Sequence, residues 1–407
     1  MRIEVVSDLR QVDPAAWDAL LAPGDAPLLS WAYLQALEEA GCVGPGTSWR
    51  PAHLCARSID GTLLAAAPAY IKLDSDGEWV HDFDWPVLAA RLGLAYYPKL
   101  VLAVPFNPVT GRRLLVPAGL SPGEVRERRQ ALLAGAQALC HQAGLSSVHV
   151  LFHDEHEQQD LVEAGFCLRS QEQYHFLNEG YRSFDDFVAR LRHGRRKSVR
   201  RERRVLAEAG IVVRTLRGLG GEQGFTMAEL DAMFDLYRGT SERYTGGAPY
   251  LNRRFFHLCG ERLGDRLELV LARGPDGRLL GGAFDLRGDR RLYGRYWGEA
   301  EHVPFLHFEV CFYHAIERCI AEGLEAFEPG HGGDQKLLRG FWPVRTYSAH
   351  RMRDARLDRT IRQYVALEAP YVTAQLAASR RRCPLRRPGE EPKGATPPAE
   401  KAPPEDV

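Results

Sequence analysis

The chain is organised around residues 291–343, which read RLYGRYWGEAEHVPFLHFEVCFYHAIERCIAEGLEAFEPGHGGDQKLLRGFWP. Residues 292–297 alternate aromatic or apolar side chains with small or charged ones, a pattern that predicts a β-strand. From Phe308 onward the apolar residues recur every three or four positions, which predicts a helix, and Gly323 is suited to end that helix. Residues 326–328 predict a second, short strand, which a glycine-rich loop follows.

This order of elements suits a site for an anionic group. A helix that begins beside a strand end presents free backbone N–H groups and a positive dipole end, and glycines let the backbone approach a ligand closely. Polar side chains gather at these points, and the cluster indicates a site more strongly than any one member. The alternative interpretation is a buried strand–helix core with solvated charges at its rim. The members of the cluster are Arg295, Tyr296, His307, Glu309, Tyr313, Glu328, Lys336 and Arg339.

The composition bounds the class of protein. The 407 residues are 45% hydrophobic, enough for real cores, and Lys plus Arg equals Asp plus Glu at 53 each. The net charge therefore gives no general attraction to nucleic acid or membrane. The eight cysteines are scattered without a C-x-x-C pair, as expected for small core residues in a reducing compartment. We see no signal peptide and no apolar run of membrane-spanning length, so we expect a cytoplasmic protein without membrane insertion.

Two short matches indicate an internal repeat. Residues 56–64 read ARSIDGTLL and residues 272–280 read ARGPDGRLL, so both predict a β-hairpin with an Asp-Gly turn. Residues 142–145 similarly parallel residues 321–324, each being the end of a helix before a strand. The repeat predicts two copies of one α/β unit in the chain.

The predicted domains cover residues 1–178 and 179–380. The second domain begins with a strongly basic helix, residues 190–206, in which Glu202 is the single acid. This helix is either a solvated connector or a surface that binds phosphates such as those of tRNA. Residues 381–407 are rich in arginine, proline and glutamate without apolar anchors, and we expect a disordered tail there.

Several motifs resemble those of a bacterial family of FemAB-like proteins labelled with peptidoglycan biosynthesis or recognition, a branch of the GNAT superfamily. The motifs are Tyr97-Pro98-Lys99, PFNPVTG at 105–111, YGRYWG at 293–298, FLHFE at 305–309 and FEPG at 327–330. The second acyltransferase domain of this branch is matched by Pro304, Leu306, Glu309, Gly323, Lys336, Gly340 and Phe341. The resemblance spans about residues 30–350 and implies an α/β fold of two tandem GNAT-like domains, with mixed β-sheets flanked by helices.

The resemblance also implies a function. FemAB proteins join amino acids to a cell-wall precursor with aminoacyl-tRNA as the donor, and GNAT enzymes move an acyl group from acyl-CoA, such as acetyl-CoA, to an amine. We therefore expect an N-acyltransferase that acts on an amine of a small molecule or cell-wall peptide. The usual GNAT pyrophosphate signature is not found before Phe308, where residues 301–307 read EHVPFLH instead.

Acyl transfer needs a proton acceptor for the amine and a stabiliser for the carbonyl oxygen. Glu309, Glu328 and His307 are the candidate bases. Lys336 and Arg295 can hold a donor phosphate or an acceptor carboxylate. A tyrosine can protonate the leaving group.

We expect these side chains to meet in one cleft of the second domain, with the first domain as its far wall. The expected catalytic residues are Glu309, His307, Glu328 and Tyr296. The expected substrate-binding residues are Arg295, Trp297, Tyr313, Lys336, Arg339, Gly330, Tyr97, Lys99, Asn107 and Thr110.

Two other functions compete with acyl transfer. One is a non-catalytic module that binds a muropeptide or another amino-sugar peptide, and turnover of a donor separates it from an enzyme. The other is metal-dependent hydrolysis, since His149, His153, Asp154 and His156 are close in sequence, with His350 elsewhere. No helical His-x-x-x-His with a nearby glutamate is present, so we expect no metal.

Overall fold

The structure, a computed structural model, describes residues 1–245 and 249–386. The strands of the first half are β1 (Arg2–Val6), β2 (Trp49–Pro51), β3 (His53–Arg57), β4 (Leu63–Ala67), β5 (Ala69–Lys72), β6 (Lys99–Leu102), β7 (Ser147–Leu151) and β8 (Cys167–Leu177). Its helices are α1 (Pro14–Asp18), α2 (Trp31–Glu39), α3 (Trp85–Arg91), α4 (Pro122–Gln142) and α5 (Gln158–Glu163).

The second half is built from a similar succession of elements. Its strands are β9 (Val212–Arg217), β10 (Leu267–Arg273), β11 (Leu279–Arg287), β12 (Arg291–Glu299), β13 (Ala326–Glu328) and β14 (Trp342–Met352). Its helices are α6 (Phe184–Arg190), α7 (His193–Glu208), α8 (Met227–Thr245), α9 (Arg253–Arg262), α10 (Leu306–Phe308), α11 (His314–Ala321), α12 (Asp334–Leu337) and α13 (Ala355–Arg382). A π-helical turn, Glu309–Tyr313, joins α10 to α11.

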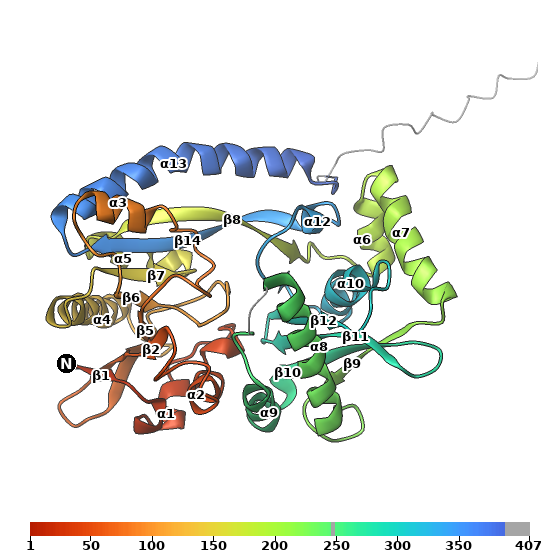
Figure 1. The fold of residues 1–407 in the computed structure, drawn as a ribbon, viewed down its shortest axis with the longest axis horizontal. Coiled ribbons are helices and arrows are strands. Elements are labelled where there is room, and N and C mark those ends of the chain that lie inside the picture. Colours follow the sequence, from red (N-terminus) through yellow and green to blue (C-terminus); the bar gives the residue numbers. More distant parts are fainter. Residues whose placement is uncertain (246–248, 387–407) are drawn as a thin grey trace, which may run out of the picture.

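The strands within residues 1–245 and 249–386 form two sheets, which helices flank (Figure 1). The larger is an 11-stranded mixed sheet of order β2-β5-β6-β7-β14-β8-β13-β12-β11-β10-β9, and the smaller has the order β1-β3-β4. The predicted strands at 292–297 and 326–328 are confirmed as β12 and β13, and Gly323 follows α11 with a φ of 65°.

The internal repeat is confirmed in detail at its two hairpins. The pairing of β3 with β4 shifts register at Arg57, and the pairing of β10 with β11 shifts at the matching Arg273. Each of these arginines donates from its guanidinium to the carbonyl of the turn glycine, Gly61 at 3.0 Å and Gly277 at 3.2 Å. Each half also continues into a parallel strand pair, β6 with β7 and β12 with β13.

The last strand of each half lies in the other half. β14 lies between β7 and β8, and β8 lies between β13 and β14, all with antiparallel pairing. The expected α/β fold of two related units is therefore confirmed, and this exchange joins the sheets of the two units into one. Whether residues 1–178 and 179–380 are separate folding domains stays a prediction.

The helix α13 runs along β8 and β14 at this junction, at the upper edge of the molecule in Figure 1. Asp354 caps its first turn by accepting from the N–H of Arg356 at 2.8 Å, so the helix begins at Ala355. The chain then docks beside α6 and α7, where Cys383 and Leu385 are buried. Of the expected tail, residues 381 and 382 belong to α13, and residues 387–407 lie outside the described part of the chain.

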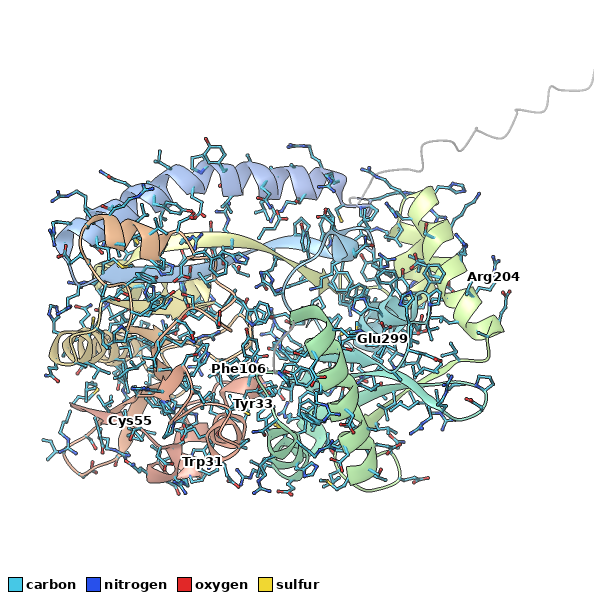
Figure 2. All side chains as sticks on the ribbon, in the orientation of Figure 1. Trp31, Tyr33, Cys55, Phe106, Arg204 and Glu299 are labelled. Atoms are coloured by element: carbon cyan, nitrogen blue, oxygen red, sulfur yellow. The ribbon has the colours of Figure 1, made fainter. Side chains whose placement is uncertain are left out.

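One hydrophobic core joins the two halves. Tyr33 of α2 packs edge-on against Phe255 of α9, with ring centroids 5.5 Å apart. Figure 2 labels Tyr33 and Phe106 in the middle of the molecule, at the boundary between the halves. In the part of the chain that the structure describes, no helix has the length and apolar character needed to cross a membrane.

Candidate functional site

A cavity of about 690 Å³ lies where β11, β12 and β13 meet the π-helical turn and the glycine-rich loop. We call it the Arg295 cavity. Five of the sequence-predicted residues line it: Arg295, Tyr296, Trp297, His307 and Lys336. The other lining residues are Ala283, Asp285, Gly294, Cys311, Phe312, Phe327, Pro329, His331, Gly332, Gly333 and Gln335.

Arg295 is the extra residue of a β-bulge. Phe284 pairs with Tyr296 and Asp285 pairs with Gly294, so Arg295 has no partner on β11. Its Nη1 donates to the carbonyls of Gly294 at 3.0 Å and Glu328 at 3.4 Å. Its Nε and Nη2 are buried and have no hydrogen-bond partner. Buried donors without a partner are rare, so this guanidinium is prepared for an anionic or carbonyl oxygen.

Lys336 is held beside Arg295 by the glycine-rich loop. Its Nζ donates to the carbonyls of Gly330 at 2.7 Å and His331 at 2.9 Å. The loop reaches back because Gly330, Gly332 and Gly333 have φ values of 80°, 83° and 101°, which favour glycine. Burial lowers the pKa of the Lys336 ammonium to about 7, and Arg295 adds to this effect while Cys311 opposes it.

Asp285 is a second group with a near-neutral pKa in this cavity, and the sequence interpretation missed it. The residue lies on β11 and is 3% exposed. Burial, and after it the Glu268 carboxylate, raises the pKa of Asp285 to about 7, although Arg318 and Arg295 oppose this rise. Among the described residues none donates a hydrogen bond to its carboxylate. The signal in the sequence was an acid inside the otherwise apolar run LLGGAFDL.

His307 and Trp297 form an aromatic wall of the cavity. The imidazole centroid of His307 is 5.2 Å from the ring of Trp297 and 5.1 Å from that of Phe312. Burial lowers the pKa of His307 to about 4, with Lys336 and Arg339 adding to the effect. The imidazole is therefore neutral at pH 7 and can accept a hydrogen bond.

The first half contributes to this region through the segment that contains Asn107 and Thr110. Asn107 donates to the hydroxyl of Tyr33 at 2.8 Å and to that of Tyr296 at 3.4 Å. The backbone N–H of Thr110 donates to Glu328 at 3.3 Å. Asn107 Oδ1 and Thr110 Oγ1 are buried without partners, so the boundary between the halves holds further polar atoms for a ligand or water.

Glu328 is held in a buried cluster at this boundary. Its carboxylate accepts from Arg291 at 3.0 Å, and the Nε2 of His175 lies 3.9 Å away. Burial raises the pKa of Glu328, but His175, Arg291 and Arg295 outweigh burial and lower it below its ordinary value. An ionised, paired carboxylate of this kind positions its neighbours more readily than it accepts a proton.

Glu309 lies outside the Arg295 cavity. It accepts from Nε and Nη2 of Arg203 on α7, at 3.0 Å and 2.9 Å, and lines a different cavity of about 680 Å³ beside α7. The π-helical turn changes which side chains of this helix face the cavity, an effect that a plain 3.6-residue period does not include. Burial raises the pKa of Glu309, although Arg203 opposes this.

Tyr313 and Arg339 also point toward α7. Both bind Glu202: the Tyr313 hydroxyl donates to it, and Arg339 Nη2 donates to both of its carboxylate oxygens at 3.0 and 3.1 Å. The Arg339 guanidinium also lies 3.2 Å from the ring centroid of Phe308. These two residues therefore hold the basic helix against the second half.

Tyr97 and Lys99 lie in a separate buried cluster of the first half. The Lys99 Nζ donates to Glu78 at 2.8 Å and to Asp82 at 2.6 Å, and Tyr97 shares a hydrogen bond of 2.8 Å with Ser75. Burial lowers the pKa of Lys99, but Glu78 and Asp82 outweigh it and raise the pKa above the ordinary value. Lys99 therefore fixes the loop between β5 and α3.

The exposed side of α7 carries most of the basic charge. Arg195, Arg200, Arg201 and Arg204 are exposed, whereas Arg203 is bound to Glu309 and Glu317. Figure 2 shows Arg204 at the outer edge of the molecule.

The segment before α10 gives no glycine-rich cradle for the pyrophosphate of acyl-CoA. Phe305 has a φ of 70°, and the N–H of Leu306 is already bonded to the carbonyl of Val303 at 3.2 Å. The residues therefore do not fit that part of acyl-CoA in the usual way. Of the histidines considered as metal ligands, His149 and His350 bond to each other at 2.7 Å, and no group of three or more ligating side chains occurs within residues 1–245 and 249–386.

Comparison with known proteins identifies the family. The chain is similar to FemX, with 12% identity and a TM-score of 0.52 over 89% of this chain and 100% of that one. It is also similar to L-PGS from Bacillus licheniformis, with 11% identity and a TM-score of 0.51 over 91% of this chain and 99% of that one. At these identities the similarity shows the fold alone. No curated protein sequence matches significantly. A family profile, however, matches residues 8–387, nearly the whole chain. The chain thus belongs to the FemAB-like family, described as peptidoglycan biosynthesis/recognition.

Proposed function

We propose that the protein is an N-acyltransferase that moves an acetyl or aminoacyl group to an amine, with the Arg295 cavity as its site. The observation that supports this best is the buried guanidinium of Arg295, which has two nitrogens without a partner. Family membership supports a substrate related to the cell wall, and a small-molecule amine or a cell-wall peptide is the proposed acceptor.

Arg295 and Lys336 are the proposed binding groups for the oxygens of the acyl donor. Negative charge develops on the carbonyl oxygen as the amine attacks, and preorganised donors in a dry cavity stabilise it strongly. With a pKa of about 7, Lys336 is charged in part of the molecules at neutral pH. Trp297 forms part of the wall on which the donor rests, and the carbonyl of Gly330 holds the Lys336 ammonium in place.

Asp285 is the proposed proton acceptor for the attacking amine. A carboxyl group with a pKa of about 7 matches the operating pH of a general base better than an ordinary aspartate does. His307 is the alternative base, since its neutral imidazole lines the same cavity. Tyr296 can donate a proton to the leaving group, and Asn107 holds its hydroxyl group.

The other proposed residues act by positioning. Glu309, Tyr313 and Arg339 hold α7, and Glu328 with Thr110 holds the boundary between the halves. Tyr97 and Lys99 fix a loop of the first half. Their substitution is expected to act on stability first and on transfer second.

The donor is proposed to be either an acyl-CoA or an aminoacyl-tRNA. The exposed arginines of α7 favour the second, because a tRNA backbone needs a basic surface. The lack of a pyrophosphate cradle before α10 also favours it. No metal ion is needed for this chemistry.

A second candidate function is non-catalytic binding of a muropeptide. The pairing of Glu309 with Arg203 and of Glu328 with Arg291 favours it, because both carboxylates are occupied by ion pairs. Turnover of a donor separates the two functions.

The test is transfer of a labelled acyl group from acetyl-CoA or alanyl-tRNA to a muropeptide with a free amine. Lys336→Met and Arg295→Gln are expected to lower the rate at least about 100-fold, as removal of an oxyanion donor does. Glu309→Gln, a control in the π-helical turn whose side chain lies outside the cavity, should retain transfer within about threefold. Equal loss in all three variants would contradict the proposed site, and saturable binding without turnover would support the binding module.

A further inference from the structure

The outward-facing side of α13 is uncharged and largely apolar over its central turns. A helix turns once in about 3.6 residues, so positions 363, 366, 367, 370, 374 and 377 share one side. Leu367 is 72% exposed, and Tyr371, its neighbour one turn later, is 77% exposed. The helix lies along the upper edge of the molecule in Figure 1. We call the following exposed residues, together with Tyr371, the outer face of α13: Gln363, Ala366, Leu367, Pro370, Ala374 and Ala377.

A residue of the first half adds to this surface. Phe83 precedes α3 and is 66% exposed. The next residue, Asp84, accepts from the hydroxyl of Tyr364 at 3.2 Å, so Phe83 is held beside α13. Tyr371 lies about two turns after Tyr364 on the same side of the helix. Phe83, Leu367 and Tyr371 therefore place three large apolar side chains on one surface, whereas scattered single ones would need no explanation.

Exposed arginines stand at both ends of the outer face. Arg359 precedes the face, and Arg380 and Arg381 follow it. No carboxylate of the described residues forms an ion pair with any of the three. The acids of the first turns, Asp354 and Asp358, already accept from other arginines of α13. The surface thus combines an apolar middle with uncompensated positive charge at both ends.

We propose that the outer face of α13 binds the surface of an anionic lipid membrane, with the helix parallel to that surface. Leu367, Tyr371 and Phe83 enter the boundary between headgroups and acyl chains, where apolar and aromatic side chains are stable. The arginines at both ends bind the phosphates of anionic lipids. The outer face lines neither the Arg295 cavity nor the cavity beside α7, so this surface is additional to the proposed function.

Two other occupants fit the outer face less well. A second copy of the chain would bring the arginines of one face against those of the other, whether the two helices are parallel or antiparallel. Like charges that meet at an interface weaken binding. An RNA would bind the arginines, but its charged backbone would lie on the apolar middle. An anionic membrane supplies phosphates for the arginines and an apolar layer for the middle.

The test is sedimentation of the full chain with phospholipid vesicles at several salt concentrations. Vesicles of phosphatidylglycerol and phosphatidylcholine in equal parts are compared with vesicles of phosphatidylcholine alone. We expect binding to the anionic vesicles to be at least about tenfold stronger and to weaken as salt rises, because salt screens the arginines. Equal binding to both kinds of vesicle, or no binding to either at low salt, would overturn the proposal.

Two variants assign the binding to the outer face. Leu367→Glu places a charge in its apolar middle, and Arg381→Glu reverses a charge at its end. Each should weaken binding to the anionic vesicles at least about fivefold. Circular dichroism checks that each variant is folded, as expected for exposed positions.

Matched controls change the net charge equally at other surfaces. Ile59→Glu lies at an exposed position of the β3–β4 turn, and Arg50→Glu lies at an exposed position of β2. Neither should change vesicle binding by more than about twofold. Controls that weaken binding as much as the α13 variants would overturn the assignment to this face.

Sedimentation velocity without vesicles tests the second copy as occupant. We expect the original protein and Leu367→Glu to have the same sedimentation coefficient. Self-association that Leu367→Glu abolishes, without vesicle binding by the original protein, would assign the face to a second copy and overturn the proposal. Loss of tRNA affinity in Arg381→Glu, without loss of vesicle binding, would assign that arginine to RNA and remove it from the lipid surface.

The outcome is separable from that of the proposed function. Transfer between dissolved substrates should be unchanged in Leu367→Glu, and vesicle binding should be unchanged in Lys336→Met. Transfer without vesicle binding would leave the enzyme and remove the lipid surface. Vesicle binding without transfer would do the reverse.

Discussion

At the level of single residues, two ionisable groups in one cavity share a pKa near 7 for the same reason. Burial removes water from both, and the loss of water disfavours the charged form of each. The pKa of Asp285 therefore rises to about 7, and that of Lys336 falls to about 7. Neither shift can be read from the sequence, because it depends on which elements cover the side chain.

The stability of the protein should show both shifts. Between the ordinary pKa of 3.8 and about 7, Asp285 holds its proton in the folded state and loses it in the unfolded state, so stability falls as pH rises. Between about 7 and 10.5, unfolding lets Lys336 regain a proton, so stability rises with pH. Each slope is at most about 1.4 kcal/mol per pH unit.

Two variants separate these effects in urea unfolding curves recorded from pH 5 to pH 9. Asp285→Asn should remove the fall of the unfolding free energy with pH below pH 7 and keep its rise above pH 7. Lys336→Met should keep the fall below pH 7 and remove the rise above it. Each variant is the control of the other. If neither variant changed the dependence of the unfolding free energy on pH, both side chains would be better solvated than the structure shows.

At the level of elements, α7 divides its arginines by function. Arg203 and Glu202 face the second half and attach the helix to it, whereas Arg200 and Arg204 face solvent. The sequence shows only a helix that is basic on all sides. The tertiary contacts decide which charges are available to a partner.

We predict that tRNA binds this exposed face with steep salt dependence. The double variant Arg200→Glu/Arg204→Glu should weaken binding at least about tenfold and reduce the slope of log affinity against log salt by about 2. Its free energy of unfolding should change by no more than about 0.5 kcal/mol, since both side chains are exposed.

Electrophoretic mobility shifts over a range of salt concentrations measure this effect. Arg359→Glu, an exposed arginine on α13, serves as the control and should behave like the original protein. A tRNA affinity that does not respond to salt, or that the control lowers equally, would rule out α7 as the binding surface.

At the level of the whole molecule, the exchange of β8 and β14 ties the halves together. Without β14, the first half exposes the edge of β7 and one edge of β8, and without β8 the second half exposes β13. Unpaired strand edges with buried side chains are unstable and prone to association. The halves also share the core around Tyr33 and Phe255.

We therefore predict that residues 1–178 and 179–407 do not fold when produced separately and form a stable complex when produced together. Circular dichroism of each fragment and co-purification of the pair measure this. A fragment of residues 1–178 that unfolds cooperatively as a monomer would show that the predicted domain boundary is also a folding boundary.

The sequence determined the elements and their repetition. The alternation at 292–297 and the apolar period after Phe308 are local patterns, and they correspond to β12 and to the helical segment that follows it. The turns at Asp60-Gly61 and Asp276-Gly277 are local too, because each closes on itself within a few residues and has its glycine at a positive φ. Arg295, His307 and Lys336 could be placed in one cavity because they flank neighbouring elements.

Only the tertiary structure decided the rest of the candidate site. Glu309 forms an ion pair with Arg203, and Lys99 forms ion pairs with Glu78 and Asp82. Such pairs form with whichever opposite charge the fold brings close, so the sequence alone does not specify them. Asp285 lies in the cavity because it alternates on β11 with Ala283, which also lines the cavity, and distant elements cover this face of the strand. The exchange of β8 and β14 likewise depends on pairing between distant segments, and no local pattern in either strand specifies its partner.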